Sequence, residues 1–123
     1  MNEDLEGALR EYLRLLDAQE YFEAHEVLEE AWHPLRLSNH PLQFLVKGLI
    51  NAAISFEHVK RNRKNMPSKA RRTIASYERY KAEATPLIAH SALFIEACEK
   101  VERLKIRYRE VFAPQNTLLE TTD

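Results

Sequence analysis

The scarcity of glycine is the feature that most restricts the fold of this chain. Only two glycines, Gly7 and Gly48, occur among 123 residues, so a β-rich fold with many tight glycine turns is disfavoured. Five prolines instead separate segments of helical length, in which apolar residues recur every three or four positions. The sequence therefore predicts an all-α protein, a single-domain helical bundle of about five helices.

The expected helices cover residues 3–17, 20–33, 41–60, 67–84 and 90–112. Pro34 should stop the second helix and Pro41 should open the third, because proline fits a first turn but interrupts a helix interior. We expect the bundle to occupy residues 1–113 and a mobile tail to follow at 114–123, where periodicity is lost.

The composition predicts a cytoplasmic protein. No stretch approaches the roughly 18 consecutive apolar residues that a membrane-spanning helix needs, and the N-terminus is acidic, unlike that of a secreted protein. The single cysteine, Cys98, cannot form an internal disulfide, which fits a reducing compartment. A homo-oligomer is compatible with these properties, and a membrane partner is not expected.

One motif that could carry chemistry lies in the second expected helix, EYFEAHEVLEEAWHP. His25, Glu29 and Trp32 are four and three residues apart, so they project from one helix face. The His and Glu could bind one divalent metal, or the carboxylate could orient the imidazole. Both arrangements need a third group. His58 could supply it, with Asn51 on the same side of the third helix, if the second and third helices are antiparallel neighbours.

The same residues have a structural interpretation that the sequence leaves open. A buried imidazole needs a hydrogen-bond partner, so His25 and Glu29 could simply tie the second helix to a neighbour. Trp32 is more typical of a core aromatic than of a binding platform. We expect a polar pocket around His25, Glu29 and His58, with Trp32 and Asn51 beside it. Whether this pocket holds a metal or belongs to an enzyme stays open, and hydrolysis would be the first reaction to test with metal.

The run KRNRKNMPSKARR, residues 60–72, holds seven of the 18 lysines and arginines and no acid. Its simplest interpretation is a solvated loop between helices. The alternative is an interaction module without enzymatic activity, which would bind a protein or nucleic acid through Arg61, Arg63 and Lys64. Nucleic acid is disfavoured because no aromatic residue lies between these charges and the net charge is −1.

The segment HEVLEEAW, preceded by YFEA, resembles the bacterial and archaeal family called domain of unknown function 309, which is recognised by His-x-x-x-Glu-x-x-Trp or Tyr. The segment KGLINAAISFEHVKRN is similar to that family's Gly-Leu-Ile segment, apolar helix, histidine and basic turn. It places Gly48 and His58 at matching positions. The resemblance covers about residues 10–80. It implies an all-helical fold and a suggested metal-binding role for His25 and Glu29, without an assigned reaction.

The chain departs from this family pattern in and before the basic turn. Asn62 stands where a glycine is usual, and the turn is several residues longer. Lys47 and Asn51 replace glutamines that often flank the Gly-Leu-Ile segment. Asparagine tolerates the left-handed conformation nearly as well as glycine, so Asn62 should preserve the turn. The two other replacements change the polar lining of any pocket.

Overall fold

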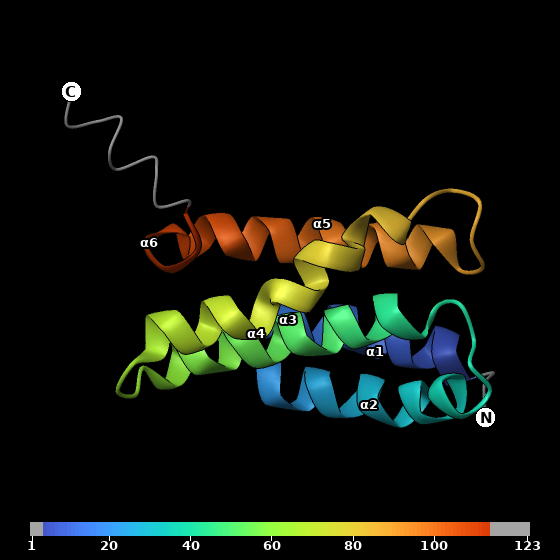
Figure 1. The fold of residues 1–123 in the computed structure, drawn as a ribbon, viewed down its shortest axis with the longest axis horizontal. Helices are drawn as coiled ribbons and strands as arrows, with labels where there is room; N and C mark the ends of the chain where they lie inside the picture. Colours follow the sequence, from blue (N-terminus) through green and yellow to red (C-terminus); the bar gives the residue numbers. More distant parts are fainter. Residues whose placement is uncertain (1–3, 114–123) are drawn as a thin grey trace.

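A computed structural model describes residues 4–113 of the chain, and the tail expected at 114–123 lies outside them. The helices are α1 (Asp4–Asp17), α2 (Tyr21–Leu37), α3 (Gln43–Arg61), α4 (Met66–Tyr80), α5 (Ser91–Arg107) and α6 (Arg109–Phe112), with a short 3-10 helix, η1 (Lys81–Glu83), after α4. The described residues form no strand, which confirms the all-α prediction (Figure 1). None of these helices is long and apolar enough to cross a membrane.

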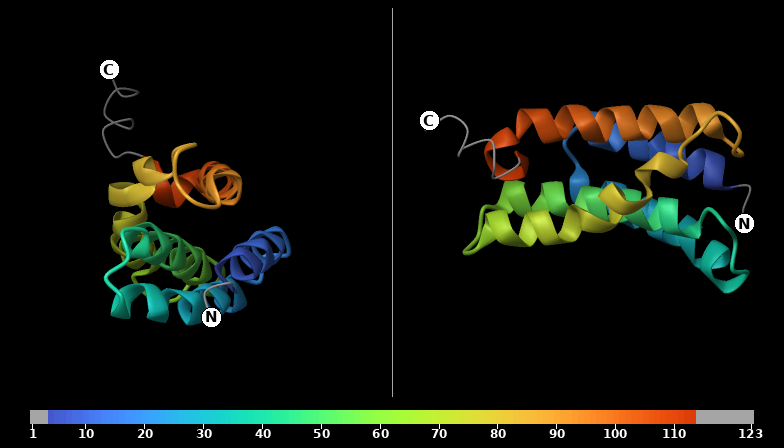
Figure 2. Two further views of the ribbon diagram at one scale, coloured as in Figure 1. Left: turned by 90° about the vertical axis from the view of Figure 1, so that its right-hand side faces the viewer. Right: turned by 45° about the horizontal axis from the view of Figure 1, so that its top comes forward.

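The first four helices pack side by side in sequence order. α1 contacts α2, α2 contacts α3 and α3 contacts α4, while α5 returns along the bundle to contact α1. In the right-hand view of Figure 2, α3 and α4 (green to yellow) lie adjacent along the long axis, and α5 (orange) lies above them. α3 is therefore the central helix, as its apolar sequence suggests.

The core takes one stripe of side chains from each long helix. Side chains without solvent exposure include Leu9, Tyr12, Tyr21, Leu28, Leu45, Leu49, Phe56, Tyr77, Phe94 and Val101. On α3 about half of the positions are buried. Six of the open ones recur at helical spacing: Phe44, Lys47, Asn51, Ile54, His58 and Arg61. This open stripe of α3 faces the side of the bundle between α2 and α4.

The prediction that Pro34 stops the second helix is wrong. α2 continues through Pro34 to Leu37. Leu35 is only 3% exposed, so its burial in the core holds the last turn in helical form. The helix ends just before Asn39, whose φ is 54°.

The third helix begins at Gln43 rather than at Pro41. His40 explains the delay, because its Nδ1 accepts a hydrogen bond of 3.0 Å from the Leu42 N–H and closes a turn there. The predicted fourth and fifth helices are also shorter. η1 replaces the end of the fourth, and Tyr108 leaves the helical conformation and separates α5 from α6.

The basic run 60–72 is not one long loop. α3 extends to Arg61 and α4 begins at Met66, so only residues 62–65 form the turn. Asn62 and Asn65 both adopt left-handed conformations, with φ of 49° and 64°. Asn62 therefore fills the role expected of a glycine at this position.

Candidate functional site

One surface pocket contains both histidines of the predicted site. His25 from the start of α2 and His58 from the end of α3 line a pocket of about 250 Å³. The two helices contact each other and are joined by the short connection at 38–42. This antiparallel arrangement places the first turns of α2 against the last turns of α3. The structure thus brings together the two residues whose proximity the sequence left open.

The pocket wall is strongly cationic. Arg61, Arg63, Lys64 and Lys69 line it, together with the carboxylate of Glu57. Glu57 accepts from Arg61 Nε at 2.6 Å, so its charge is already balanced. Within residues 4–113 the other three cations form no ion pair. The pocket therefore has a net positive charge that attracts anions.

Part of the pocket lining is apolar. Phe22, Ile54 and Met66 contribute to the lining, and the Phe22 side chain is 42% exposed. The His25 ring meets Phe22 edge to face at 4.9 Å, and the Arg61 guanidinium lies 5.7 Å from the Phe22 ring centre. Apolar surface beside a few convergent polar groups is typical of small-molecule sites.

The His25 ring has a defined orientation. Its Nδ1 lies 2.6 Å from the Phe22 carbonyl oxygen, which only accepts, so Nδ1 carries the proton and donates. In the neutral ring Nε2 is then the atom with the free lone pair. It lies 3.5 Å from Glu29 Oε1. Nε2 can therefore take a proton that Glu29 stabilises, or bind a metal beside Glu29.

Lys47 provides a cation to the rest of the motif. Its Nζ lies 3.9 Å from Glu29 Oε2 and 4.2 Å from the centre of the Trp32 ring. The Arg36 guanidinium lies 5.4 Å from the same ring. Trp32 is half-buried and packs against the core, while its ring binds cations through its π-face. Glu29 and Trp32 thus both contact the ammonium group of Lys47. Neither Glu29 nor Trp32 lines the 250 Å³ pocket.

The predicted three-ligand metal site is not assembled in the described part of the chain. Among residues 4–113, no three histidine, cysteine, aspartate or glutamate side chains gather closely enough to hold a metal ion. His25 Nε2 and Glu29 Oε1 are two adjacent donors, but the Lys47 ammonium near Glu29 opposes a second cation. Metal binding stays a prediction.

Asn51 faces α4 rather than His25. Its Nδ2 donates to Ser76 Oγ at 2.8 Å. It lines a second, shallower hollow of about 590 Å³, whose lining also includes Arg72 and Arg79.

The pKa of His58 is lowered from its ordinary value of 6.5, mainly by burial. The nearby charges of Lys69 and Arg61 lower it further, and Glu57 acts in the opposite direction. His58 is therefore neutral at neutral pH, and an anion bound among these cations would favour its protonated form.

Sequence reasoning missed the apolar part of the pocket and Lys69. Two sequence spacings indicate the apolar part. Phe22 precedes His25 by three residues, and Ile54 precedes His58 by four, so each apolar residue shares a helix face with a histidine. Lys69 could not be placed in this way, because its position depends on the turn at 62–65.

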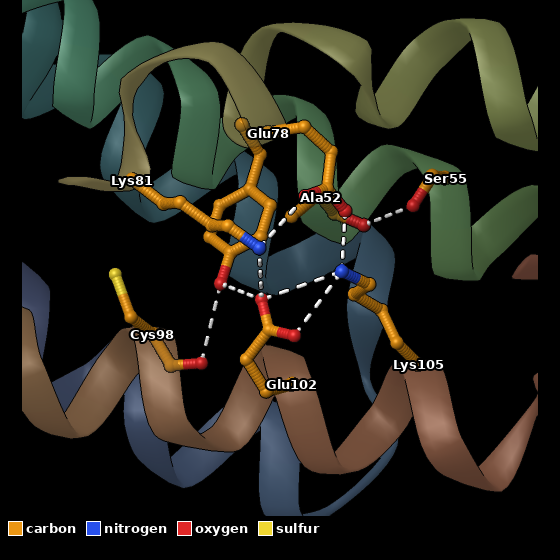
Figure 3. A network of polar contacts seen from close by, with 8 residues as sticks. Ala52, Ser55, Glu78, Lys81, Cys98, Glu102 and Lys105 are labelled. Atoms are coloured by element: carbon orange, nitrogen blue, oxygen red, sulfur yellow. Dashed lines mark hydrogen bonds and ion pairs between the residues drawn. The ribbon is translucent and has the colours of Figure 1, made fainter. Parts of the chain in front are cut away.

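A second polar network joins α4 to α5 (Figure 3). The Tyr77 hydroxyl donates to Glu102 at 2.6 Å. Lys81 Nζ lies 3.1 Å from Glu102 and 2.8 Å from Glu78, and Lys105 pairs with both carboxylates. Burial and the hydrogen bond to Glu102 raise the pKa of Tyr77 far above its usual range. Two lysines balance two glutamates here, so the network is a structural link and leaves no charge free for a ligand.

Cys98 lies beside this network, and its carbonyl oxygen accepts a longer hydrogen bond of 3.3 Å from Tyr77. Burial raises the pKa of the Cys98 thiol to about 11. The thiol is therefore protonated at neutral pH and is a poor nucleophile.

Residues 9–69 match the model of a family described as domain of unknown function, DUF309. The matched segment contains His25, Glu29 and Trp32, and it includes every residue that lines the 250 Å³ pocket. The α4–α5 network lies beyond it. No match was found among curated proteins or among solved structures. Through residues 9–69, the chain belongs to the DUF309 family, which confirms the resemblance to that family.

Proposed function

We propose that the protein binds a small organic anion, a phosphate or carboxylate attached to an apolar group, in the pocket of His25 and His58. The observation that carries this proposal is the composition of the pocket wall. Four lysines and arginines line the pocket beside apolar residues, and the single carboxylate among them is already paired with Arg61.

The residues have distinct roles in this proposal. Arg61 is held in place by Glu57, so its guanidinium is oriented before a ligand arrives. Arg63 and Lys64, from the turn at 62–65, supply charge at the rim. Phe22 offers an exposed ring for the apolar part of the ligand. The volume of about 250 Å³ suits a metabolite-sized molecule.

His58 is the group that would respond most directly to the ligand. It is neutral before binding because burial, Lys69 and Arg61 lower its pKa. An anion in the pocket offsets these positive charges and raises that pKa, so binding should take up a proton and strengthen as the pH falls.

A divalent metal at His25 and Glu29 is the second candidate. It is supported by the orientation of His25, whose Nδ1 hydrogen bond leaves Nε2 directed toward Glu29. The nearby Lys47 ammonium weighs against it. An open metal position would activate water for hydrolysis, so this candidate is the one that would make the protein an enzyme.

The experiment is an NMR titration of the histidine ring signals with phenyl phosphate and with pyrophosphate at low salt. We expect the His58 signal to shift in a saturable way, and the double change Arg63→Gln and Lys64→Gln to weaken binding on the order of tenfold. The matched control is Arg10→Gln on α1, an exposed arginine paired with Glu6. The absence of any saturable His58 shift at millimolar ligand would exclude the proposed function.

A further inference from the structure

We propose that the pocket is one end of a binding track for single-stranded nucleic acid, which continues along the groove between α3 and α4. This inference rests on the proposed function, because it takes the anion in the pocket to be one phosphate of a phosphodiester chain. It adds residues far from the turn at 62–65, above all Arg72 and Arg79.

The two hollows described above belong to one face. Ile54 lines the pocket and Asn51 lines the second hollow, and they lie about one turn apart on the open stripe of α3. On α4, Lys69 lines the pocket and Arg72, one turn further, lines the second hollow. The hydrogen bond from Asn51 to Ser76 joins α3 to α4 within the second hollow. The pocket and the second hollow therefore lie one after the other along α3 and α4, from the turn at 62–65 toward the end of α4.

Unpaired positive charge follows the whole groove. Within residues 4–113, Lys69, Arg72 and Arg79 form no ion pair, and neither do Arg63 and Lys64. Cations elsewhere on the surface are often neutralised in place, as Arg10 is by Glu6. The whole chain carries a net charge of −1, so the cations that line the two hollows form a local excess of positive charge.

Exposed aromatic rings stand at both ends of the row of charges. Phe22 lies at the pocket end. At the other end Phe44 is 48% exposed and stacks on Tyr80, with ring centres 5.2 Å apart and planes at 19°. Tyr80 follows Ser76 by one turn of α4, on the same face.

This combination favours single-stranded nucleic acid over an acidic peptide. A cationic groove follows the sugar-phosphate backbone, and aromatic rings stack on bases, which are unpaired only in a single strand. Guanidinium groups match phosphate geometry, and Arg61, Arg63, Arg72 and Arg79 supply them along the groove. The eleven residues from Lys69 to Arg79 span about 15 Å, enough for several nucleotides. An acidic peptide would use the charges but leave the aromatic rings without a role.

The test measures fluorescence anisotropy of labelled oligouridylate and oligothymidylate of about 12 nucleotides, at several salt concentrations, with the full chain. We expect the double change Arg72→Gln and Arg79→Gln to weaken oligonucleotide binding on the order of tenfold, and to reduce the slope of log K against log salt by about 1.4. The double change Arg10→Gln and Arg14→Gln on α1 is the matched control. Phe44→Ser should weaken oligonucleotide binding but leave inorganic polyphosphate binding unchanged.

The outcomes separate the track from the pocket. If the Arg72 and Arg79 variant binds oligonucleotide as tightly as the wild type, or if neither oligonucleotide binds at low salt, the track is wrong. A saturable His58 shift with pyrophosphate would still support the small-anion site in that case. Equal affinity for polyglutamate at matched charge and salt would also overturn the track, because it would identify a surface for acidic proteins. If the His58 ring signal does not shift when phenyl phosphate or pyrophosphate is added, the proposed function is wrong instead.

Discussion

Gly48 on α3 lies directly against the backbone of Tyr77 on α4. A Cβ atom at position 48 would come within 3.0 Å of the Tyr77 Cα and 3.3 Å of the Ser76 carbonyl oxygen. These are backbone atoms that cannot rotate away, so the absence of a side chain at Gly48 sets how closely α3 and α4 approach. The groove between the two helices depends on this distance.

Gly48→Ala should therefore lower the free energy of unfolding by about 1–3 kcal/mol, because the helices must separate to admit the methyl group. Gly7→Ala is the matched control. It has no atom within 4 Å of its Cβ position and lies near the start of α1, as the fourth residue of that helix. The change should therefore stabilise the protein, by at most about 0.5–1 kcal/mol. Urea denaturation of both variants checks the pair. Equal effects of the two changes would show that the contact does not limit the packing.

The Tyr77 hydroxyl should contribute to stability through its hydrogen bond to Glu102. Tyr77→Phe keeps the buried ring but removes the donor, and we expect a loss of about 1–2 kcal/mol in the free energy of unfolding. Tyr80→Phe removes a hydroxyl that makes no hydrogen bond within residues 4–113, so its effect should be close to zero. Urea unfolding of the two variants distinguishes a structural link from an incidental contact, since an incidental contact predicts the same result for both.

The low pKa of His58 should depend on its cationic neighbours. Burial is the largest cause, so Lys69→Gln should raise the pKa part of the way toward 6.5 and no further. Arg61, Arg63 and Lys64 still line the pocket in this variant. An NMR titration of the ring signal, assigned with His58→Gln, measures the change. A pKa that does not move in Lys69→Gln would show that the Lys69 charge does not act on His58.

The same shift has a defined effect on stability. Because the folded pKa is lowered, the unfolded chain binds more protons as the pH falls below 6.5. The free energy of unfolding should therefore decrease as the pH falls from 6.5 toward the lower pKa of His58 in the folded protein. Unfolding by urea at about pH 7.5 and about pH 5.5 should show a smaller loss in His58→Gln than in the wild type. An equal loss would assign the pH dependence to other groups.

The sequence predicts the fold well because helical periodicity is a local property. The buried stripe of each helix follows from spacing alone, as with Tyr12 on α1, Leu28 on α2 and Phe56 on α3. The helix ends depend on tertiary contacts. Proline disfavours a helix interior at Pro34, but burial of Leu35 outweighs this preference, and no local rule weighs the two.

The candidate site was only partly predictable for the same reason. His25 and Glu29 share a face by helical geometry, so their proximity could be derived. Lys47, although noted as a departure from the family pattern, could not be placed over Trp32, because that contact depends on how α2 and α3 are rotated against each other. Lys69 joins the pocket only because Asn62 and Asn65 make a sharp turn.

Lys47 also provides the sharpest test of the metal hypothesis. Its ammonium lies near Glu29 Oε2, where it stabilises the carboxylate and repels a second cation. Lys47→Gln removes this charge and introduces the residue that the family pattern usually has there. If His25 and Glu29 form a metal site, the variant should bind zinc or manganese more tightly than the wild type. Added metal should then raise its melting temperature more, because a ligand that binds only the native state stabilises it.

The further change His25→Ala should abolish that increase, and His58→Ala should do so only if His58 is the third ligand. Lys105→Gln, which removes a lysine from the α4–α5 network, is the control for charge alone. A melting temperature that metal does not change in either the wild type or Lys47→Gln would exclude the metal site and leave His25 and Glu29 as a structural pair on α2.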